Sequence, residues 1–211
     1  MRPVAPPGLT ATTFHAALRE LADRDADLAR VVETLGPPPF WNRPPGFPTL
    51  VHLILEQQVS LASARAVFDR LRATLGTLTA PSFLTLDDDA LRALGFSRQK
   101  TRYCRLLAAA VAGGELDLDG LDELDDDRVH EVLVQLPGIG RWTTSVYLLM
   151  ALRRPDAWPV GDLALQVAAQ KVKGLGARPS AAELETLGEP WRPWRAVAAR
   201  VLWHHYLTPQ S

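Results

Sequence analysis

Apolar residues recur at three- and four-residue spacing along nearly the whole chain, and this pattern constrains the fold most. No stretch alternates between apolar and polar residues as a half-buried strand would, so we predict an all-α fold. Seventeen prolines and fourteen glycines interrupt the pattern, which favours a globular bundle of short helices over a coiled coil. We expect helices over about 11–35 with a break near Asp25, 49–59, 61–75, 87–94, 97–112, 119–135, 141–152, 162–173, 180–187 and 193–206, and a crossing loop over Gly36–Pro48.

The composition limits the class of protein. With 211 residues and 47% apolar content, the chain can bury a core as one compact unit or as two lobes of one. Cys104 is the single cysteine, which excludes a disulfide within the chain and a cysteine-ligated iron–sulfur cluster. No apolar run reaches the ~20 residues of a membrane span, and the first residues lack the apolar core of a signal peptide. We therefore expect a cytoplasmic protein without a membrane partner.

The net charge of −1 argues against a broad basic surface for nucleic acid. The charges are, however, unevenly distributed. Residues 86–135 contain 6 Arg and Lys against 12 Asp and Glu, whereas residues 136–211 contain 9 against 5. Any attraction for nucleic acid should therefore be local and come from the last third of the chain.

A glycine hairpin, Leu136–Thr143 (LPGIGRWT), lies between two segments of helical period. Gly138 and Gly140 can adopt positive φ and allow another backbone to come close. The next helix begins at about Arg141, so its positive end and the hairpin amides point the same way. This arrangement suits a nucleic-acid phosphate.

A single carboxylate follows on a Pro/Gly loop, Trp158–Asp162 (WPVGD), at the start of another helix. Taken alone, Asp162 is most simply a helix cap, and the hairpin is most simply a tight connection between helices. Together, a phosphate site and a fixed acid indicate a protein that holds a DNA backbone and performs chemistry beside it.

The run from Leu136 to Gln166 resembles the signature of the helix-hairpin-helix, Gly/Pro-Asp (HhH-GPD) DNA glycosylases. Within that superfamily it is most similar to the 3-methyladenine DNA glycosylase II (AlkA) type. The likeness extends over roughly residues 40–207 and includes four further blocks, Arg43–Phe47 (RPPGF), Ile54–Ser60 (ILEQQVS), Leu94–Lys100 (LGFSRQK) and Pro193–Arg195, together with Trp203.

The resemblance implies two helical lobes with a DNA cleft between them. Residues 49–152 would form the lobe with the hairpin, and residues 10–48 with 153–207 would form the other, so that 1–211 is one glycosylase domain. The AlkA type also has a small N-terminal sheet domain. Only about 40 residues precede the Arg-Pro-Pro-Gly block, so this chain should lack it.

The resemblance also implies the chemistry. Asp162 would be the catalytic aspartate, which stabilises the oxocarbenium-like sugar as the base departs and orients the attacking water. The AlkA type often has an acidic residue just before it, where this chain has Gly161. Trp203 would stack on the extruded base, Trp142 would be a second aromatic beside the hairpin, and Tyr147 and Phe47 would complete the base pocket.

Trp142 bears on the mechanism as well. Relatives with lyase activity place a lysine there, which forms a Schiff base with the sugar. The resemblance therefore implies a monofunctional glycosylase that uses water and leaves an abasic site.

The remaining expected contacts are with DNA and with a cation. Base flipping requires a side chain that fills the gap, and Gln58 is the best candidate, although two exposed glutamines at a helix end are an equally good interpretation. In relatives, hairpin carbonyls hold a monovalent cation, Na⁺ or K⁺, which would implicate the main-chain oxygens of Val134, Leu136 and Ile139. The expected DNA-contacting residues are Gln57, Gln58, Val59, Gly138, Ile139, Gly140, Arg141 and Thr143.

The expected function is removal of alkylated bases from damaged duplex DNA by a monomer that needs no cofactor for the reaction. One alternative is a glycosylase of the same fold for deaminated or mismatched bases. The other is a non-catalytic DNA-binding module that uses the hairpin alone, against which Asp162 argues.

Overall fold

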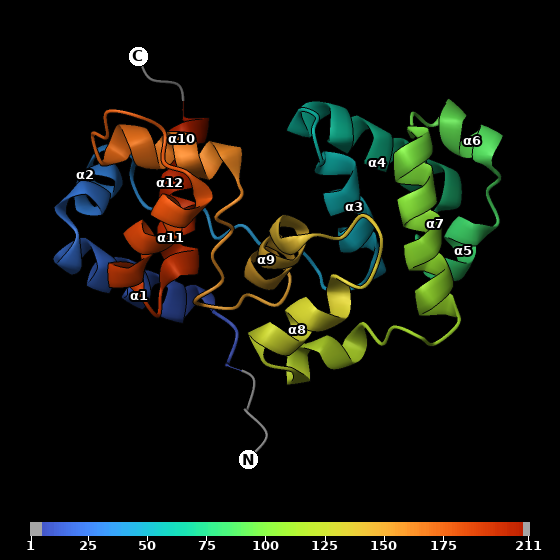
Figure 1. Cartoon of the computed structure of the whole chain (residues 1–211), viewed down its shortest axis with the longest axis horizontal. Helices are drawn as coiled ribbons and strands as arrows, with labels where there is room; N and C mark the ends of the chain where they lie inside the picture. The colour runs from blue at the N-terminus through green and yellow to red at the C-terminus, as the bar shows by residue number, and fades with distance from the viewer. Residues whose placement is uncertain (1–5, 209–211) are drawn as a thin grey trace. The chain divides into compact units, whose positions relative to one another are not determined.

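The computed structural model describes residues 6–208, and these are helical with no β-strand. They divide into two compact units (Figure 1). The first unit contains Arg43–Tyr147, and the second contains Pro6–Asn42 with residues 148–208. The all-α fold class predicted from the apolar spacing is confirmed. None of the described helices is long and apolar enough to cross a membrane.

The first unit is built around helix α3, in which seven of the ten residues are buried. It packs against α4 and α7, and α7 also packs against α5 and α6. A short 3-10 helix, η1, precedes α8, and α9 follows the hairpin and continues into the second unit. The elements of this unit are α3 (Phe47–Glu56), α4 (Leu61–Leu75), α5 (Ala80–Leu84), α6 (Asp88–Ala93), α7 (Arg98–Ala112), η1 (Asp119–Glu123), α8 (Asp126–Leu133) and α9 (Arg141–Met150).

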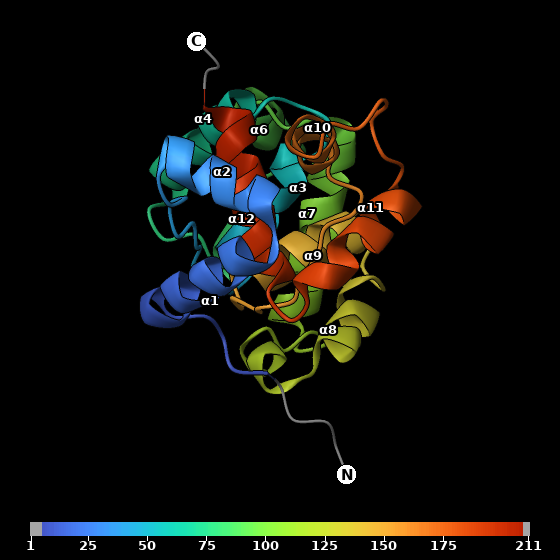
Figure 2. The ribbon, with the colours of Figure 1, turned by 90° about the vertical axis from the view of Figure 1, so that its left-hand side faces the viewer.

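The second unit is built around helix α12, which is buried continuously from Arg195 to Trp203. This helix packs against α1, α2 and α10, as Figure 2 shows. The remaining elements are α1 (Ala11–Arg24), α2 (Ala26–Leu35), α10 (Leu163–Val172), α11 (Ala181–Gly188), η2 (Glu189–Trp191) and α12 itself (Arg195–Leu207).

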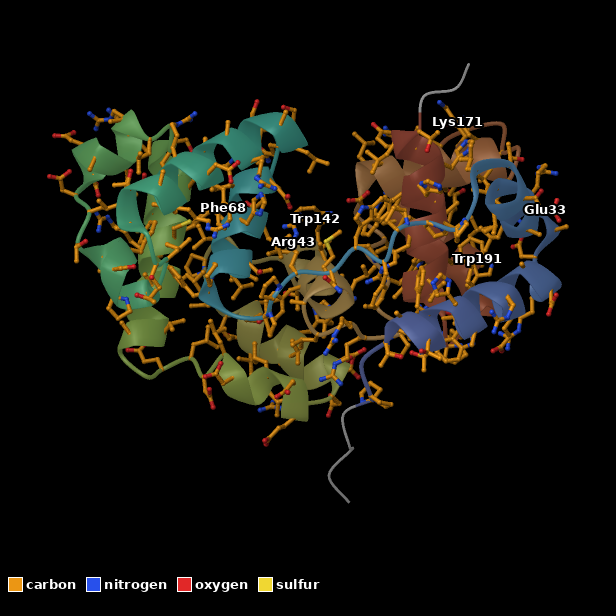
Figure 3. The ribbon with its side chains drawn as sticks, turned by 180° about the vertical axis from the view of Figure 1, so that it is seen from behind. Glu33, Arg43, Phe68, Trp142, Lys171 and Trp191 are labelled. Atoms are coloured by element: carbon orange, nitrogen blue, oxygen red, sulfur yellow. The ribbon has the colours of Figure 1, made fainter. Side chains whose placement is uncertain are left out.

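The predicted break near Asp25 is present, because Asp25 ends α1 and caps the start of α2. Its carboxylate accepts hydrogen bonds from the amides of Asp27 and Leu28. It also accepts a hydrogen bond from Nε1 of Trp191 at 2.8 Å (Trp191 is labelled in Figure 3). The ammonium of Lys173 completes the site at 3.1 Å. This one carboxylate therefore joins three segments of the second unit.

Arg200 is fully buried in α12 without a carboxylate among its hydrogen-bond partners. Its guanidinium donates to the carbonyls of Ala196, Trp41 and Leu149, at 2.9, 3.1 and 2.8 Å. It also lies over the ring of Phe40, 5.4 Å from the centroid. Burial lowers the pKa of Arg200 to about 10. Carbonyl dipoles and aromatic faces therefore solvate this cation inside the unit.

Several predicted boundaries are wrong. Helix α3 begins at Phe47, because Pro48 is accepted in the first turn of a helix, so the crossing loop ends at Gly46. The same helix ends at Glu56, three residues before the predicted end. The predicted helix over 119–135 is two elements, η1 and α8, because Leu124 is extended and Asp125 caps α8.

Candidate active site

The hairpin forms as predicted between α8 and α9. Gly138 has a φ of +90°, a left-handed conformation that favours glycine, and the Ile139 amide donates to the Leu136 carbonyl at 3.0 Å. Ile139 is buried, whereas Gly140 and Arg141 are exposed. The Gly140 carbonyl accepts the Thr144 amide at 3.0 Å, which begins α9. An exposed hairpin therefore leads directly into the amino terminus of a helix, as an anion site requires.

The two hairpin glycines differ in what surrounds them. A Cβ built on Gly138 would lie 2.2 Å from Cγ of Tyr103, whereas a Cβ on Gly140 would meet nothing within 4 Å. Gly138 is therefore needed for packing against α7 as well as for its positive φ. Only Gly140 leaves open space on the side where a phosphate could approach.

The Gln57–Val59 segment forms a turn between α3 and α4. Gln58 and Val59 are exposed, and Gln58 has a φ of +58°, which is uncommon for a residue with a Cβ. Gln57 points back into the unit, and its side-chain amide donates to the Gly138 carbonyl at 2.8 Å and to Oγ1 of Thr143 at 3.0 Å. Gln57 is therefore tied to the hairpin whereas Gln58 is exposed, although the sequence predicted DNA contact for both.

The base of this turn is held by a charged cluster. Arg43, labelled in Figure 3, donates two hydrogen bonds to the Glu56 carboxylate, at 2.7 and 3.1 Å. His52 stacks on Phe68 with ring centroids 4.2 Å apart, and burial lowers the pKa of this imidazole. The paired Glu56 side chain is only 7% exposed. Bidentate pairing of this kind fixes the end of α3, from which the exposed turn projects.

Asp162 caps α10 in the second unit, as its position in the sequence predicted. Its Oδ1 accepts the Leu165 amide at 2.8 Å, and its own amide donates to the Pro159 carbonyl at 2.9 Å. The loop before it is held in turn by Gln166, whose side chain donates to the Val160 carbonyl at 2.9 Å. The half-buried carboxylate is therefore fixed in place at the positive end of a helix.

Trp203 contacts Asp162 directly. Its Nε1 donates to Oδ1 of Asp162 at 3.0 Å, across 41 residues of sequence. Trp203 is 7% exposed, so its indole is largely buried. The sequence predicted both residues for one site but not this hydrogen bond. A charged acceptor held by an indole and a backbone amide has a well-defined orientation.

The other predicted aromatic residues lie in the first unit. Trp142, labelled in Figure 3, is half-buried in the first turn of α9. Tyr147 is fully buried, its hydroxyl accepts the Gly46 amide at 2.8 Å, and burial raises its pKa. Phe47 is buried, with its ring centroid 5.9 Å from that of Phe83. A base-pocket role for these three residues stays a prediction.

The sequence did not reveal the part that α7 has beside the hairpin. Tyr103 packs against Gly138, and its hydroxyl accepts the side-chain amide of Gln99 at 2.8 Å. Lys100 donates to the Leu55 carbonyl at 2.6 Å, and burial lowers the pKa of this ammonium. The i, i+4 spacing of Gln99 and Tyr103 was a visible signal of a side-chain pair, but it does not indicate what the pair contacts.

With this geometry established, comparison with known proteins places the chain in a family. A profile of the HhH-GPD superfamily base excision DNA repair proteins matches residues 51–193. The chain belongs to this superfamily, and the resemblance seen in the sequence is confirmed.

Three similar proteins are informative. A probable bifunctional transcriptional activator/DNA repair enzyme AlkA of Mycobacterium tuberculosis is 35% identical over 90% of this chain, which spans only 42% of that protein. The structure of a DNA-3-methyladenine glycosidase from Bacillus halodurans has a TM-score of 0.75 and 30% identity, covering 91% of this chain and 89% of that one. A 3-methyladenine DNA glycosylase of Schizosaccharomyces pombe in complex with abasic DNA has a TM-score of 0.79 and 25% identity, covering 90% and 95%.

Proposed function

We propose that this chain is a monofunctional DNA glycosylase that hydrolyses the N-glycosidic bond of alkylated bases such as 3-methyladenine in duplex DNA. The observation that carries the proposal is the Asp162 carboxylate, held at the start of α10 by the Leu165 amide and by Trp203. A non-catalytic DNA-binding module does not need an oriented carboxylate. The superfamily match and the two 3-methyladenine glycosylase structures support the same class of reaction.

In the proposed reaction, positive charge develops on the sugar as the base leaves. The Asp162 carboxylate stabilises this oxocarbenium-like state and orients a water molecule, which attacks C1′ and gives up a proton to that carboxylate. The glycosidic bond breaks with its electron pair going to the base. Alkylated purines such as 3-methyladenine are cationic, so they leave readily without a dedicated general acid, and aromatic faces attract them.

The first unit would hold the DNA during this step. The Gly140 amide and the first turn of α9 suit a phosphate, with Arg141 exposed beside them. The exposed Gln58 and Val59 would fill the gap left by the flipped nucleotide. Trp142 stands where lyase relatives have a lysine, so water attacks the sugar and an abasic site is the product.

A monovalent cation at the hairpin is part of the same proposal. The side-chain amide of Gln57 donates to the Gly138 carbonyl, and other carbonyls of the hairpin are the expected ligands. Those of Val134, Leu136 and Ile139 are the candidates. The Leu136 carbonyl accepts the Ile139 amide, and its second lone pair can still bind a cation. Bound Na⁺ or K⁺ would supply positive charge for the phosphate.

The test is base release from methylated duplex DNA, with the freed bases separated by chromatography. The parent should release 3-methyladenine, and Asp162→Asn should lower the single-turnover rate by at least about 10²-fold because it removes the stabilising charge. Asparagine also caps helices well, so the variant should fold and still bind DNA. An excision rate within a few-fold of the parent contradicts the catalytic role of Asp162. Release of deaminated bases alone would favour the alternative glycosylase of the same fold.

A further inference from the structure

The exposed turn between α3 and α4 is held by more than its own backbone. Gln58 and Val59 are exposed on it, as is Leu61 at the start of α4, and Gln58 has a left-handed φ of +58°. A residue with a Cβ keeps such a conformation only where its surroundings enforce it. We propose that Gln57 is the positioning residue that fixes this turn against the hairpin, and that Gln57 does not itself enter the DNA. The proposal rests on the proposed glycosylase function.

The geometry of the Gln57 side chain carries the argument. A glutamine amide nitrogen has two donors, and both are used within the first unit. One reaches the Gly138 carbonyl at 2.8 Å and the other Oγ1 of Thr143 at 3.0 Å. Gly138 lies in the hairpin and Thr143 in the first turn of α9, so one side chain bridges the turn to both parts of the phosphate site. Insertion of Gln57 into DNA would break both hydrogen bonds.

Helix α7 provides a second connection between the same two parts. Lys100 donates to the Leu55 carbonyl at 2.6 Å, which holds the last turn of α3. One turn further along α7, Tyr103 packs against Gly138, and the Gln99 side chain donates a hydrogen bond that orients the Tyr103 hydroxyl. The hairpin and the turn are therefore each attached to α7 as well as to each other through Gln57.

This closed set of contacts has a consequence for base flipping. Extrusion of a nucleotide costs unstacking energy, and contacts that hold its backbone and fill the gap together offset that cost. Gln57 links the hairpin, which would bind the phosphate, to the turn, which would fill the gap. The distance between these two parts is therefore set before DNA binds, and binding needs to order few further side chains. Loss of the link should leave phosphate binding intact and impair extrusion of the base.

Gln57→Met tests this idea, because methionine keeps the length of the side chain and removes both donors. The expected result is an about ten-fold lower single-turnover excision rate at saturating protein, with the half-saturating protein concentration within two-fold of the parent. The fluorescence rise of 2-aminopurine placed beside the lesion, which reports unstacking, should fall in parallel. Gln135→Met is the matched control, because the Gln135 side-chain amide donates locally, to the Glu131 carbonyl four residues before it, at 3.3 Å. It should match the parent.

A double-mutant cycle separates positioning from insertion. Thr143→Val removes the hydroxyl that accepts from Gln57 and keeps the side-chain shape. If Gln57 acts through the hairpin, the two substitutions are clearly less than additive, both in the excision rate and in urea unfolding of the free protein. Additive losses in the rate would mean that Gln57 itself enters the DNA and would overturn the proposal. An inactive parent would instead contradict the proposed function, while the unfolding cycle would still test the contact.

Discussion

The hydrogen bond between Trp203 and Asp162 predicts a large effect from a small substitution. Trp203→Phe keeps most of the buried ring and removes only the Nε1 donor that reaches Asp162 at 3.0 Å. A hydrogen bond to a charged group contributes about 1.5–3 kcal/mol. The Leu165 amide still binds the same oxygen, so the carboxylate is loosened and not released, and the lower end of that range applies. About 1.5 kcal/mol corresponds to an about ten-fold slower reaction.

The assay is single-turnover excision of 3-methyladenine, with binding to abasic DNA measured beside it. We expect the rate to fall about ten-fold and the binding constant to stay within two-fold, because the donor acts on the carboxylate and not on the phosphates. A rate within two-fold of the parent would refute the idea that this indole orients the catalytic group. Equal losses in rate and in binding would indicate a general loss of shape instead.

A matched control is available in the same unit. Trp191→Phe also removes an indole donor from an aspartate, Asp25, which it reaches at 2.8 Å. Trp191 is buried like Trp203, so a comparable loss of stability is expected. Asp25 takes no part in the proposed reaction. The excision rate of this variant, measured well below its unfolding temperature, should match the parent.

Two further predictions concern the hairpin and its flank. Gly140→Ala should weaken binding to lesion-containing and unmodified duplexes equally and leave Tm unchanged, because its Cβ enters open space beside the phosphate site. Gly138→Ala should weaken binding and also lower Tm, because its Cβ meets the Tyr103 ring. Equal losses of Tm in the two variants would contradict this distinction. With Trp142 in place of a lysine, borohydride should trap no covalent protein–DNA adduct, and the DNA strand should break at the abasic site only after alkali treatment. A stoichiometric adduct would show that another amine attacks the sugar.

The helical period was sufficient to predict much of the fold. The predicted helices over 61–75 and 97–112 correspond to α4 and α7. Their ends were predictable because the apolar pattern of each helix continues up to a glycine that ends it. Asp162 was predicted to lie at the start of a helix, and it caps α10. The five-residue helix α5 was missed, although Thr79 and Ser82 form a capping box at its start. An element so short shows no period to detect.

The end of α3 could not be predicted, for a physical reason. Gln57, Gln58 and Val59 contain no glycine or proline, so no local signal marks the left-handed residue that ends the helical pattern. Side chains distant in the sequence enforce that conformation. The Gln57 amide reaches across 81 residues to Gly138, and a single sequence carries no record of such a pairing.

The dual position of Asp162 has a consequence for loss of function. Its carboxylate begins α10 and is also the proposed catalytic group, so one side chain serves both the fold and the proposed reaction. Asparagine begins a helix about as well as aspartate, so removal of the charge need not trigger unfolding or degradation. The inactive protein would persist and occupy damaged sites without clearing them. In a cell that makes both the parent and the Asp162→Asn variant, the variant would then shield lesions from the active parent.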